Sequence, residues 1–454
     1  IGSRYGISNE GNGTFNFYDG IIKGKTAING NLSAKEKGYE VITTEENEIE
    51  TAILGNLPVA KIGEKEYYTF QEAFDACPSD GTETTVEVLR NCTTDMANII
   101  EENKNIVLDI QSYKIVSGIE NLFTNNGKFK IVDSIGNGRI ISAKGTILKN
   151  EEKGNFAINN ITMQMTGSSA IDETIENKGM LEVTGGVIIS DGLKNKCINN
   201  IEQGTVKITG GTVSAYTYAI YNTSSNKVEI EGGTVQATYY YEGYSAIYNN
   251  TENGVVEIKG GLVTNQGKAI ENKKGTIKVT GGEIRTTQGD TRYSECGIYN
   301  NGKVIIEDGK VAALYGGSGI QNEGGTIEIT GGTVSAPEWY NSIINRGTLE
   351  ISGGTIKSNE KGIYNNSILK MTGGTVEVQE SKSYNYAALE CGGGTATIEG
   401  GTIKYNNIGN TSYNTAVIRI TTNTATLTLG KEDGNVSITN PEIIGSRYGI
   451  NNEE

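Results

Sequence analysis

A short phrase built around two glycines recurs along this chain and limits the folds that the chain can adopt. It consists of an apolar–polar–apolar triplet, one polar residue, two glycines and a further polar–apolar pair, as in Val206–Val213 and Leu349–Ile356. From Gly186 to Gly401 the second glycine position recurs in nine steps over 215 residues, so the period is about 24 residues. A repeat of this length predicts a solenoid, in which each turn of chain stacks on the previous turn.

The local pattern within each period indicates strands rather than helices. The triplets alternate apolar and polar residues, as in 206–208, and no run between the glycine pairs has the spacing of an amphipathic helix. A second phrase, a small residue followed by Ile-x-Asn, adds another strand to each period, as in Ala219–Asn222. With 62 glycines to form corners and only 4 prolines to interrupt strand pairing, the sequence predicts an all-β, three-sheet parallel β-helix.

The asparagine of the second phrase is predicted to lie inside this solenoid. Ile and Asn are two residues apart, so their side chains lie on the same face of a strand, and Ile is expected to face the core. An amide group both donates and accepts hydrogen bonds, so stacked asparagines can satisfy one another from coil to coil. The alternative, that Asn merely favours turns, explains the regular spacing less well. The predicted ladder comprises Asn177, Asn200, Asn222, Asn249, Asn272, Asn300, Asn322, Asn345 and Asn365.

The chain divides into four predicted segments. Residues 1–45 have the features of the final coils of a preceding solenoid unit, and residues 46–57 form an acidic linker. Residues 58–90 are predicted to be an N-terminal cap that consists of a hairpin and a helix over 69–77. Residues 91–454 are predicted to form a parallel β-helix of about 14 coils.

The predicted cap helix has a start signal and an apolar face. Thr69 and Glu72 have the spacing of a capping box. The residues that share one face of the helix are Phe70, Ala73, Phe74 and Cys77. We expect this face to cover the open end of the solenoid, because an uncovered end exposes apolar core and unpaired strand edges. Cys77 and Cys92 both lie near the cap, so a disulfide between them is an alternative to two separate thiols.

The first ten residues return near the other end of the chain. Ile1–Glu10 and Ile444–Glu453 are identical at nine of ten positions and differ only in Ser8 against Asn451. We expect a larger repeat of about 443 residues in a tandem array, in which the segment after Glu454 resembles the residues from Gly11 onward.

Three stretches together resemble a known class of module. They are the cap pattern Ala60–Ala73, the phrase Gly13–Gly20 and the Gly-Gly-Thr coils, and they resemble modules of giant tandem-repeat surface or adhesin proteins of Gram-positive bacteria. Such modules belong to the right-handed parallel β-helix class that pectate lyases share. The resemblance implies a right-handed winding and an adhesive or structural role at the cell surface.

Catalysis is not expected, although polysaccharide lyases and hydrolases share this fold. The chain contains no histidine, so the Gly-His-Gly signature of the pectin-degrading hydrolases cannot occur. No two aspartates are adjacent, and the aspartates of the coils are scattered singly, which argues against a calcium site. We therefore predict a protein that is not an enzyme and has no metal and no cofactor. The net charge of −15 argues against nucleic acid and anionic membranes as partners, and no apolar run is long enough to insert into a membrane.

Length varies at one corner of the predicted coil. The stretch from the residue after the glycine pair to the next Ile covers 8 steps in Thr212–Ile220, but 13 in Thr234–Ile247 and 15 in Glu283–Ile298. In solenoids a face with such insertions is often the binding face, and exposed aromatic residues there suit stacking on sugars or contact with proteins. The candidate binding face comprises Tyr239, Tyr240, Tyr241, Tyr244, Tyr293, Trp339, Tyr340, Tyr384, Tyr386, Tyr405 and Tyr413.

Tyrosine is also an ordinary strand residue that tolerates a wet surface, so these aromatics have a plain structural alternative. The tyrosines between Ile and Asn are interpreted in this plain way, as an exposed outward stack of Tyr221, Tyr248, Tyr299 and Tyr364.

The sequence thus predicts a non-catalytic structural repeat module of an extracellular fibre or cell-surface protein, which stacks head to tail with copies of itself. The alternative is a glycan- or protein-binding adhesin that uses the tyrosine-rich corner, and a polysaccharide lyase or hydrolase is a third hypothesis. The expected location is extracellular, either at the cell surface or secreted.

Overall fold

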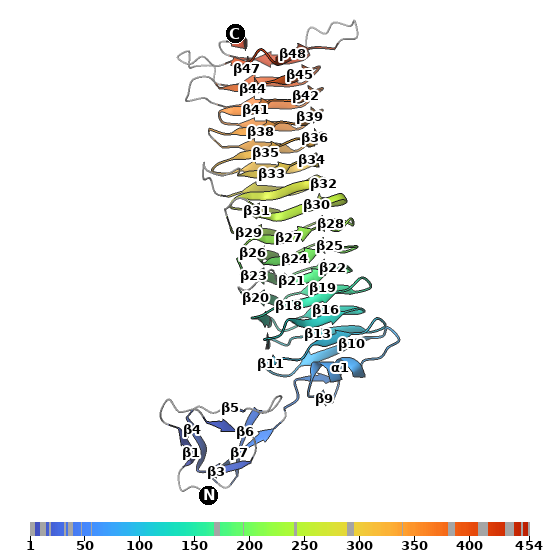
Figure 1. The fold of residues 1–454 in the computed structure, drawn as a ribbon, viewed down its shortest axis with the longest axis vertical. Helices are drawn as coiled ribbons and strands as arrows, with labels where there is room; N and C mark the ends of the chain where they lie inside the picture. The colour runs from blue at the N-terminus through green and yellow to red at the C-terminus, as the bar shows by residue number, and fades with distance from the viewer. Residues whose placement is uncertain are drawn as a thin grey trace.

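The computed structural model describes residues 5–9, 15–17, 20–30, 33–34, 40–46, 48–55, 57–167, 173–193, 195–239, 243–287, 295–337, 339–379, 386–406, 416–431, 440–445 and 448–452. Within these ranges the chain forms fifty strands and one helix. Most of the strands belong to one long stack that extends from the helix to the C-terminal end (Figure 1).

The strands from β10 to β50 form an all-β solenoid of about 15 turns, which confirms the predicted stack of parallel coils and lies close to the predicted number of turns. Each turn contributes a strand segment to each of three columns, and neighbouring segments within a column pair in parallel. Three long strands bend around corners and therefore belong to more than one column: β30 (Ser245–Ile258), β32 (Lys268–Thr286) and β34 (Lys303–Ala313).

The first column contains the strands that precede the glycine corner. Its other members are β10 (Glu83–Val88), β13 (Asn105–Asp109), β16 (Lys128–Val132), β19 (Asn155–Asn159), β22 (Met180–Val183), β25 (Thr205–Ile208), β28 (Val228–Ile230), β36 (Thr326–Ile329), β39 (Thr348–Ile351), β42 (Ile368–Met371), β45 (Gly394–Ile398) and β48 (Ala425–Leu429).

The second column follows that corner. Its other members are β11 (Cys92–Thr94), β14 (Lys114–Ser117), β17 (Arg139–Ser142), β20 (Thr162–Met165), β23 (Val187–Ser190), β26 (Thr212–Ala215), β29 (Thr234–Ala237), β31 (Leu262–Asn265), β37 (Thr333–Ala336), β40 (Thr355–Ser358), β43 (Thr375–Val378), β46 (Thr402–Tyr405) and β49 (Glu442–Ile444).

The third column carries the Ile-x-Asn phrase. Its other members are β12 (Asn98–Ile100), β15 (Asn121–Asn125), β18 (Thr146–Asn150), β21 (Glu173–Asn177), β24 (Lys196–Asn200), β27 (Tyr218–Asn222), β33 (Cys296–Asn300), β35 (Ser318–Asn322), β38 (Asn341–Asn345), β41 (Lys361–Asn365), β44 (Ala387–Cys391), β47 (Ala416–Ile420) and β50 (Tyr448–Asn452).

The core is built from aliphatic residues that lie on top of one another in register. Val206 pairs with Val228, which pairs with Val256 on the next turn, and these side chains are at most 1% exposed. Every second residue of a strand faces this core, so the apolar–polar alternation of the sequence becomes an inside–outside alternation. A continuous column of buried aliphatic side chains is the main stabilising feature of the solenoid.

The glycine corner requires glycine at its second position for two reasons. Gly211 has φ of 76°, which favours glycine, and a Cβ at this residue would lie 2.6 Å from the carbonyl oxygen of Gly186 on the turn below. Gly332 repeats the arrangement, with φ of 68° and a Cβ that would lie 2.8 Å from the carbonyl oxygen of Gly309. The close stacking of coils at this corner therefore explains why the glycines recur with the period of the coil.

The asparagine ladder is confirmed, and it is longer than predicted. Each ladder Asn donates from Nδ2 to Oδ1 of the Asn on the next turn, over 2.7 to 2.9 Å, from Asn125 to Asn365. Asn125 and Asn150 extend the ladder toward the N-terminus. The Ile-x-Asn phrase did not identify them, because Phe123 and Leu148 occupy the position that Ile has in the later coils. The ladder ends after Asn365, where Cys391 occupies the next position.

The predicted cap is present at the N-terminal end of the solenoid. A hairpin of β8 (Ala60–Ile62) and β9 (Lys65–Tyr67) leads into α1 (Phe70–Ala76), and the capping box between Thr69 and Glu72 is confirmed. β8 pairs antiparallel with β10, so the first solenoid strand lies within the segment predicted as the cap.

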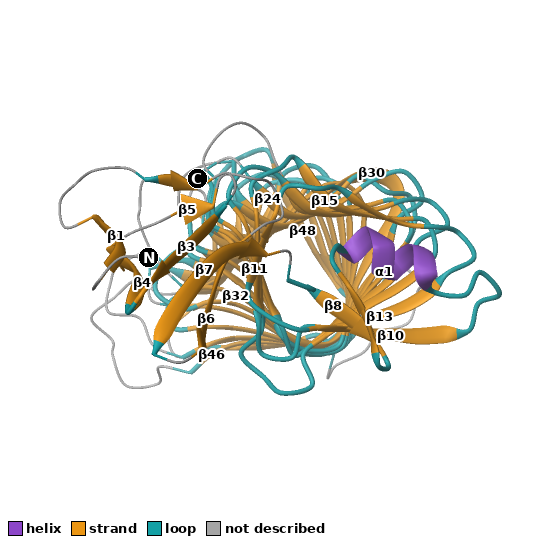
Figure 2. Ribbon diagram, turned by 90° about the horizontal axis from the view of Figure 1, so that it is seen from below, coloured by secondary structure: helices purple, strands orange, loops and turns teal. Residues whose placement is uncertain are grey.

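The helix covers the core of the first coils. The ring of Phe74 lies 6.2 Å from that of Phe123 and 5.8 Å from that of Phe129, measured between centroids. The Lys104 ammonium donates to the carbonyl oxygens of Asp75 and Cys77 at the C-terminal end of the helix, over 2.9 and 2.8 Å, where a positive charge is favourable. Figure 2 looks along the solenoid from this end, where α1 contacts β8, β9 and β12.

The N-terminal strands follow the same three-column plan and then depart from it. β1 (Tyr5–Asn9) pairs in parallel with β4 (Thr26–Gly30), and β2 (Asn16–Phe17) pairs in parallel with β5 (Ser33–Ala34). β3 (Ile21–Gly24) pairs instead with β7 (Ile49–Gly55) in the antiparallel direction. The described strands β1 to β7 pair only with one another.

The predicted linker over 46–57 is wrong. Residues 40–46 and 49–55 form the strands β6 (Glu40–Glu46) and β7, which make a hairpin, and Ala52 in β7 is fully buried. The acidic residues suggested a solvated connector, but Glu50 lies on the same face of the strand as Ala52 and accepts a hydrogen bond from the backbone amide of Ala27 over 2.6 Å.

No disulfide joins Cys77 to Cys92. All five cysteines of the chain lie in the described ranges and are buried as thiols, so the alternative of separate small core residues holds. The only helix in the described part of the chain is α1 with seven residues, which is far too short to cross a membrane.

Candidate functional site: a tyrosine cluster at the variable corner

Over the regular coils from β22 to β46, the corner between the second and third columns is where the coils differ most in length. From β22 to β46 the connections between the first and second columns contain three residues each wherever the strand is interrupted, as in 209–211 and 330–332. The connections between the second and third columns range from two residues, 216–217, to ten, 406–415. The predicted location of the insertions at one corner is therefore confirmed.

Six tyrosines from two neighbouring turns pack together at this corner, and we call them the tyrosine cluster. They are Tyr216, Tyr218, Tyr221, Tyr239, Tyr244 and Tyr248. Tyr221 and Tyr248 occupy the same position on successive turns, and their rings stack at 4.8 Å with an angle of 14°. Tyr239 joins the cluster from the connection between β29 and β30, with its ring 4.7 Å from that of Tyr216.

Tyr218 holds the cluster together. Its ring makes edge contacts with Tyr221, Tyr244 and Tyr248 at 5.3 to 5.6 Å, and its hydroxyl donates to the carbonyl oxygen of Gly243. Burial raises the pKa of Tyr218, and the nearby Glu271 carboxylate raises it further. The hydroxyl therefore stays protonated and serves as a hydrogen-bond donor rather than a base.

A buried carboxylate lies directly beyond the cluster. Glu271 follows Tyr248 in the same outward position of the third column, it is 2% exposed, and Tyr299 follows it on the next turn. Its Oε1 atom lies 3.3 Å from the Lys268 ammonium and 2.9 Å from that of Lys273. Its Oε2 atom is buried and has no hydrogen-bond partner among the described residues.

Lysines complete the border of the site. The Lys196 ammonium lies 4.0 Å from the centroid of the Tyr221 ring, and the Lys268 ammonium lies 4.2 Å from that of Tyr299. Burial lowers the pKa of Lys196, whereas the hydrogen bond to Glu271 raises the pKa of Lys273. The site therefore combines aromatic rings, hydroxyl groups and ammonium groups next to a buried carboxylate, a combination suited to binding a ligand with both apolar and hydroxylated faces.

The structure places the predicted aromatic residues in several different environments. Tyr239 and Tyr244 belong to the tyrosine cluster. Trp339, 53% exposed, and its neighbour Tyr340 lie at the same corner several turns away, between β37 and β38. Tyr386 lies nearer the C-terminal end, with its ring centroid 4.3 Å from the Lys361 ammonium. The candidates that lie outside the described residues are Tyr240, Tyr241, Tyr293, Tyr384 and Tyr413.

Tyr405 does not belong to an exposed face. It is 3% exposed and lies in the core, because it is two residues from Ile403 in β46 and both side chains point inward. The strand alternation would have identified it, but its place beside the insertion corner suggested otherwise.

The outward stack of tyrosines is less exposed than predicted and is interrupted. Tyr221, Tyr248, Tyr299 and Tyr364 are all half-buried, and Glu271 separates Tyr248 from Tyr299. Sequence reasoning missed Tyr216, which lies in the two-residue connection one turn before the 238–244 connection, and Tyr218, which begins β27 directly after it. Their position at the same corner, one period earlier, was the signal that could have found them.

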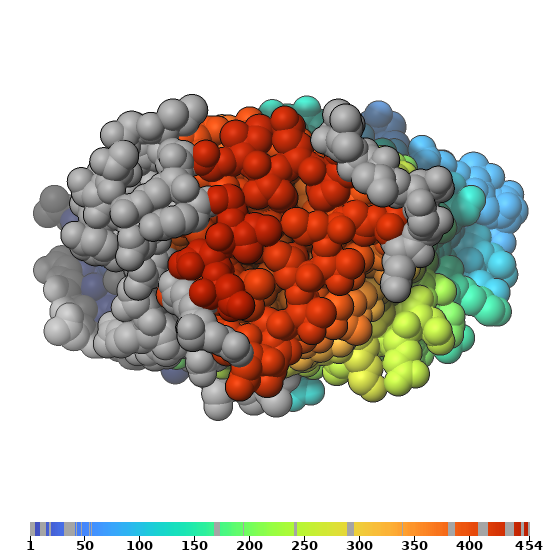
Figure 3. All heavy atoms as spheres, turned by 90° about the horizontal axis from the view of Figure 1, so that it is seen from above, coloured from blue at the N-terminus to red at the C-terminus, as the bar shows by residue number. Residues whose placement is uncertain are grey.

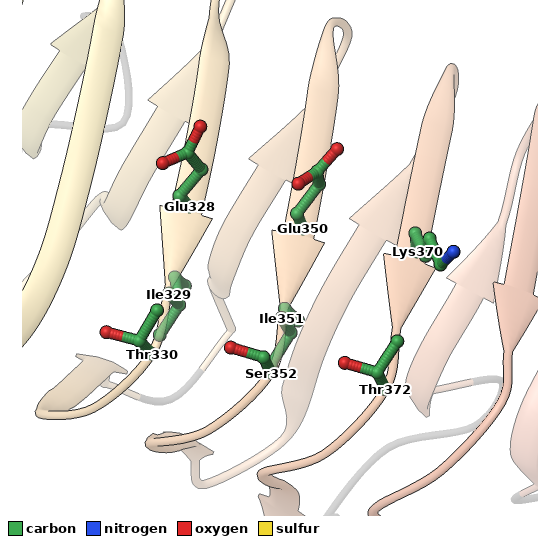
Figure 4. Close-up of a pocket in the computed structure, with 8 residues that line it drawn as sticks. All are labelled: Glu328, Ile329, Thr330, Glu350, Ile351, Ser352, Lys370 and Thr372. Carbon is green, nitrogen blue, oxygen red and sulfur yellow. The ribbon is translucent and has the colours of Figure 1, made fainter.

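A shallow groove on the first column is the second candidate site. It has a volume of about 290 Å³ and is lined by residues of three successive turns (Figure 4). Glu328, Glu350 and Lys370 form one row of outward side chains, and the hydroxyls of Thr330, Ser352 and Thr372 form a second row.

Charged side chains of this groove form ion pairs with other residues of the solenoid. Glu328 lies 2.7 Å from the Lys303 ammonium, and Lys370 lies 3.2 Å from Glu399. Within the described ranges no group of three or more Cys, Asp and Glu side chains is arranged to hold a metal ion. The tyrosine cluster, with its buried carboxylate, is therefore the stronger candidate for a binding site.

These features define the class of protein as a parallel β-solenoid with an internal asparagine ladder and aromatic residues at its variable corner. In comparisons with protein-family models, curated protein sequences and solved structures, nothing matches the chain.

Proposed function

We propose that this chain is a non-catalytic structural repeat module of an extracellular fibre or cell-surface protein. In this proposal it is a right-handed, three-sheet β-helix that acts as a stiff rod and stacks head to tail with copies of itself. The observation that carries the proposal is the unbroken ladder from Asn125 to Asn365, in which ten successive amide hydrogen bonds join eleven turns.

The physics of such a ladder favours a mechanical role. Each turn contacts only the turns beside it, so stability and stiffness depend on the interfaces between neighbouring turns. From Asn125 to Asn365 the ladder provides one buried side-chain bond at each interface between turns, besides the backbone pairing of the three columns. Ion pairs between turns, such as Lys207 with Glu231 and Lys278 with Glu307, add a smaller contribution at the surface.

The tandem arrangement and the location rest on the sequence. The near-identity of Ile1–Glu10 and Ile444–Glu453 supports an array of copies. The acidic composition and the resemblance to modules of giant surface proteins of Gram-positive bacteria support an extracellular location.

The rod and its location can be tested separately. Electron microscopy of the purified chain is expected to show rods whose solenoid part is about 70 Å long, at about 4.8 Å for each turn. Brief protease treatment of intact cells that produce the protein is expected to release its peptides. Compact particles would contradict the rod, and release of peptides only after cell lysis would contradict the surface location.

A glycan- or protein-binding adhesin is the alternative, and the tyrosine cluster is the observation that favours it. Stacked and edge-on rings beside a buried carboxylate form a surface that can contact the apolar face of a sugar and hydrogen-bond its hydroxyl groups. Rod and adhesin are compatible roles, because the cluster lies on the outside of the coils.

A glycan array separates the two roles. The adhesin is expected to bind defined glycans, and a double substitution of Tyr239→Ala and Tyr244→Ala is expected to lower the signal at least about tenfold. Trp339→Ala tests the second aromatic group at the same corner. Tyr315→Ala is the matched control, because Tyr315 is 75% exposed at this corner but outside the cluster. Absence of binding, or binding unaffected by the cluster variant and by Trp339→Ala, would leave only the structural role.

A further inference from the structure

The C-terminal end of the solenoid is open within the described residues. No described strand pairs with the outer edges of β48, β49 and β50. Leu429 is 42% exposed and Ile450 is 43% exposed, whereas the residues paired with them on the turn below, Ile398 and Ile418, are fully buried. Figure 3 looks onto this end of the molecule. An end with free strand edges and exposed core residues attracts further strands.

The strand at this open end has a near-copy elsewhere in the chain, and there it is covered. β1 has the sequence of β50 except for Ser8 in place of Asn451. β4 lies on β1 in parallel, with Ile7 paired to Ile28 and Ser8 to Asn29. Ala27 of β4 is fully buried by this packing.

The surroundings of one glycine differ between the two copies of this strand. At Gly6 in β1 a Cβ would lie 2.6 Å from both the carbonyl oxygen of Ala27 and Cγ2 of Ile22, so the packing of β3 and β4 requires glycine there. At the equivalent Gly449 in β50 a Cβ would meet no described atom within 4 Å. The sequence of β50 thus has the glycine that a covering strand needs, although no described strand covers it.

The strands that follow β1 also show how a solenoid of this kind can end. β5 lies on β2 in parallel, as in an ordinary coil, but β7 lies on β3 in the antiparallel direction and β6 lies beyond β7. β6 carries exposed Thr43, Thr44, Glu45 and Glu46 at the outer edge of this sheet. Charged residues on an edge strand oppose the addition of another strand, so β6 closes the stack.

From these observations we propose that the open end is an interaction surface for a second copy of this chain, joined in tandem so that its residues 11–55 follow Glu453. The copies of β2, β3 and β4 then pair with β48, β49 and β50, and the copy of β4 takes the register that β4 has on β1. Ile450 lies on the copy of Ile28, and Asn451 lies on the copy of Asn29. The copied β6–β7 hairpin ends the solenoid. This inference rests on the proposed head-to-tail rod and assigns its junction to particular strands.

The test is an extended chain in which residues 11–57 are repeated after Glu453. Amide hydrogen exchange of residues 448–452 is expected to be at least about a hundredfold slower than in the chain of 454 residues, because their strand becomes internal. The matched control carries Ala27→Asp in the appended copy alone, which places a charge at a buried position and is expected to remove the protection.

Gly449→Ala provides a second and independent readout. It is expected to leave exchange at β50 unchanged in the chain of 454 residues, where the new methyl group meets open space. In the extended chain it is expected to abolish most of the protection, because the methyl group would meet the copies of Ala27 and Ile22. Equal exchange in the extended and unextended chains would overturn the proposal, and so would equal tolerance of Gly449→Ala in both.

Electron microscopy of the same two chains separates this junction from the proposed function. Rods without slower exchange at β50 would overturn the junction alone, whereas the absence of rods would overturn the structural role.

Discussion

At the scale of single residues, the buried asparagines distinguish this solenoid from a purely aliphatic one. A ladder amide accepts from the turn before, donates to the turn after and also reaches backbone carbonyl groups. Asn249 accepts from Asn222 over 2.8 Å and donates to Asn272 over 2.9 Å and to the carbonyl oxygen of Lys274 over 2.8 Å. Buried polar groups are tolerated when they are satisfied in this way.

Asn249→Ala is therefore expected to destabilise the solenoid by about 3 kcal/mol, because it leaves the buried amide of Asn222 and the Oδ1 atom of Asn272 without their partner. Urea unfolding followed by circular dichroism measures the change. Asn301→Ala at an exposed position is the control and is expected to change stability by less than about 0.5 kcal/mol. Equal effects of the two substitutions would show that the ladder does not stabilise the fold.

The buried thiols make stability depend on alkaline pH. Burial raises the pKa of Cys296, ordinarily 9.0, to about 12. Above pH 9 the unfolded chain loses this proton while the folded chain keeps it, so stability falls as pH rises from about 9 to 12. The expected slope is about 1.4 kcal/mol per pH unit for each such thiol.

Cys296→Ala is expected to reduce that slope, which melting curves between pH 8 and pH 11 would show. Cys391, whose pKa burial also raises to about 12, remains in the variant and preserves part of the dependence. An unchanged slope, or rapid labelling of the native thiols at pH 8, would contradict this account.

At the scale of elements, the corners of one coil differ in their tolerance of change. The Thr-Gly-Gly corner stacks backbone on backbone, with the second glycine in the left-handed region. The variable corner carries side chains outward and accepts connections of different lengths. Insertions should therefore be tolerated at the second and not at the first.

Three glycines inserted after Tyr315, at the exposed tip of the 314–317 connection, are expected to lower the melting temperature by no more than about 3 °C. The same insertion after Gly331 is expected to cause a large loss of stability or aggregation, because the pairing of β36 and β37 with the neighbouring turns is disturbed. Calorimetry of both variants checks this, and similar melting temperatures would show that the glycine corner is not a constraint.

At the scale of the whole molecule, the turns behave as nearly independent layers. Removal of residues 250–272 joins Asn249 to Lys273 and deletes one turn, because Asn249 and Asn272 occupy equivalent positions. The shortened chain is expected to fold with native-like circular dichroism and a solenoid shorter by about 4.8 Å.

Removal of residues 250–261 is the matched control. It deletes about half a turn, so every later strand meets the wrong column, and misfolding is expected. Small-angle scattering and size-exclusion chromatography distinguish the two products. A folded half-turn deletion, or an unfolded full-turn deletion, would show that the turns are not interchangeable layers.

The repeating features of this protein were determined by its sequence. The period, the strand alternation and the Ile-x-Asn spacing are local patterns that can be read from neighbouring residues. Because equivalent positions stack on one another, each pattern leads to the same structure on every turn. The solenoid, the ladder and the capping box of α1 could therefore be predicted. The tertiary structure was needed where a residue's role depends on neighbours a turn away. The register between turns shows that Phe123 and Leu148 take the place of Ile. Residues 49–55, within the predicted acidic linker, form a strand because β3 and β6 pair with them on either side.

The same reason explains the candidate site. The sequence pattern predicted that tyrosines lie near one corner. The contacts between their rings depend on the register between β27 and β30, which brings Tyr218 against Tyr244 and Tyr248. Burial of Glu271 and of Tyr405 likewise depended on packing between turns, because a side chain's exposure is set by what the next coil places over it. The sequence alone determined how the chain repeats, and the tertiary structure decided which departures from the repeat come together.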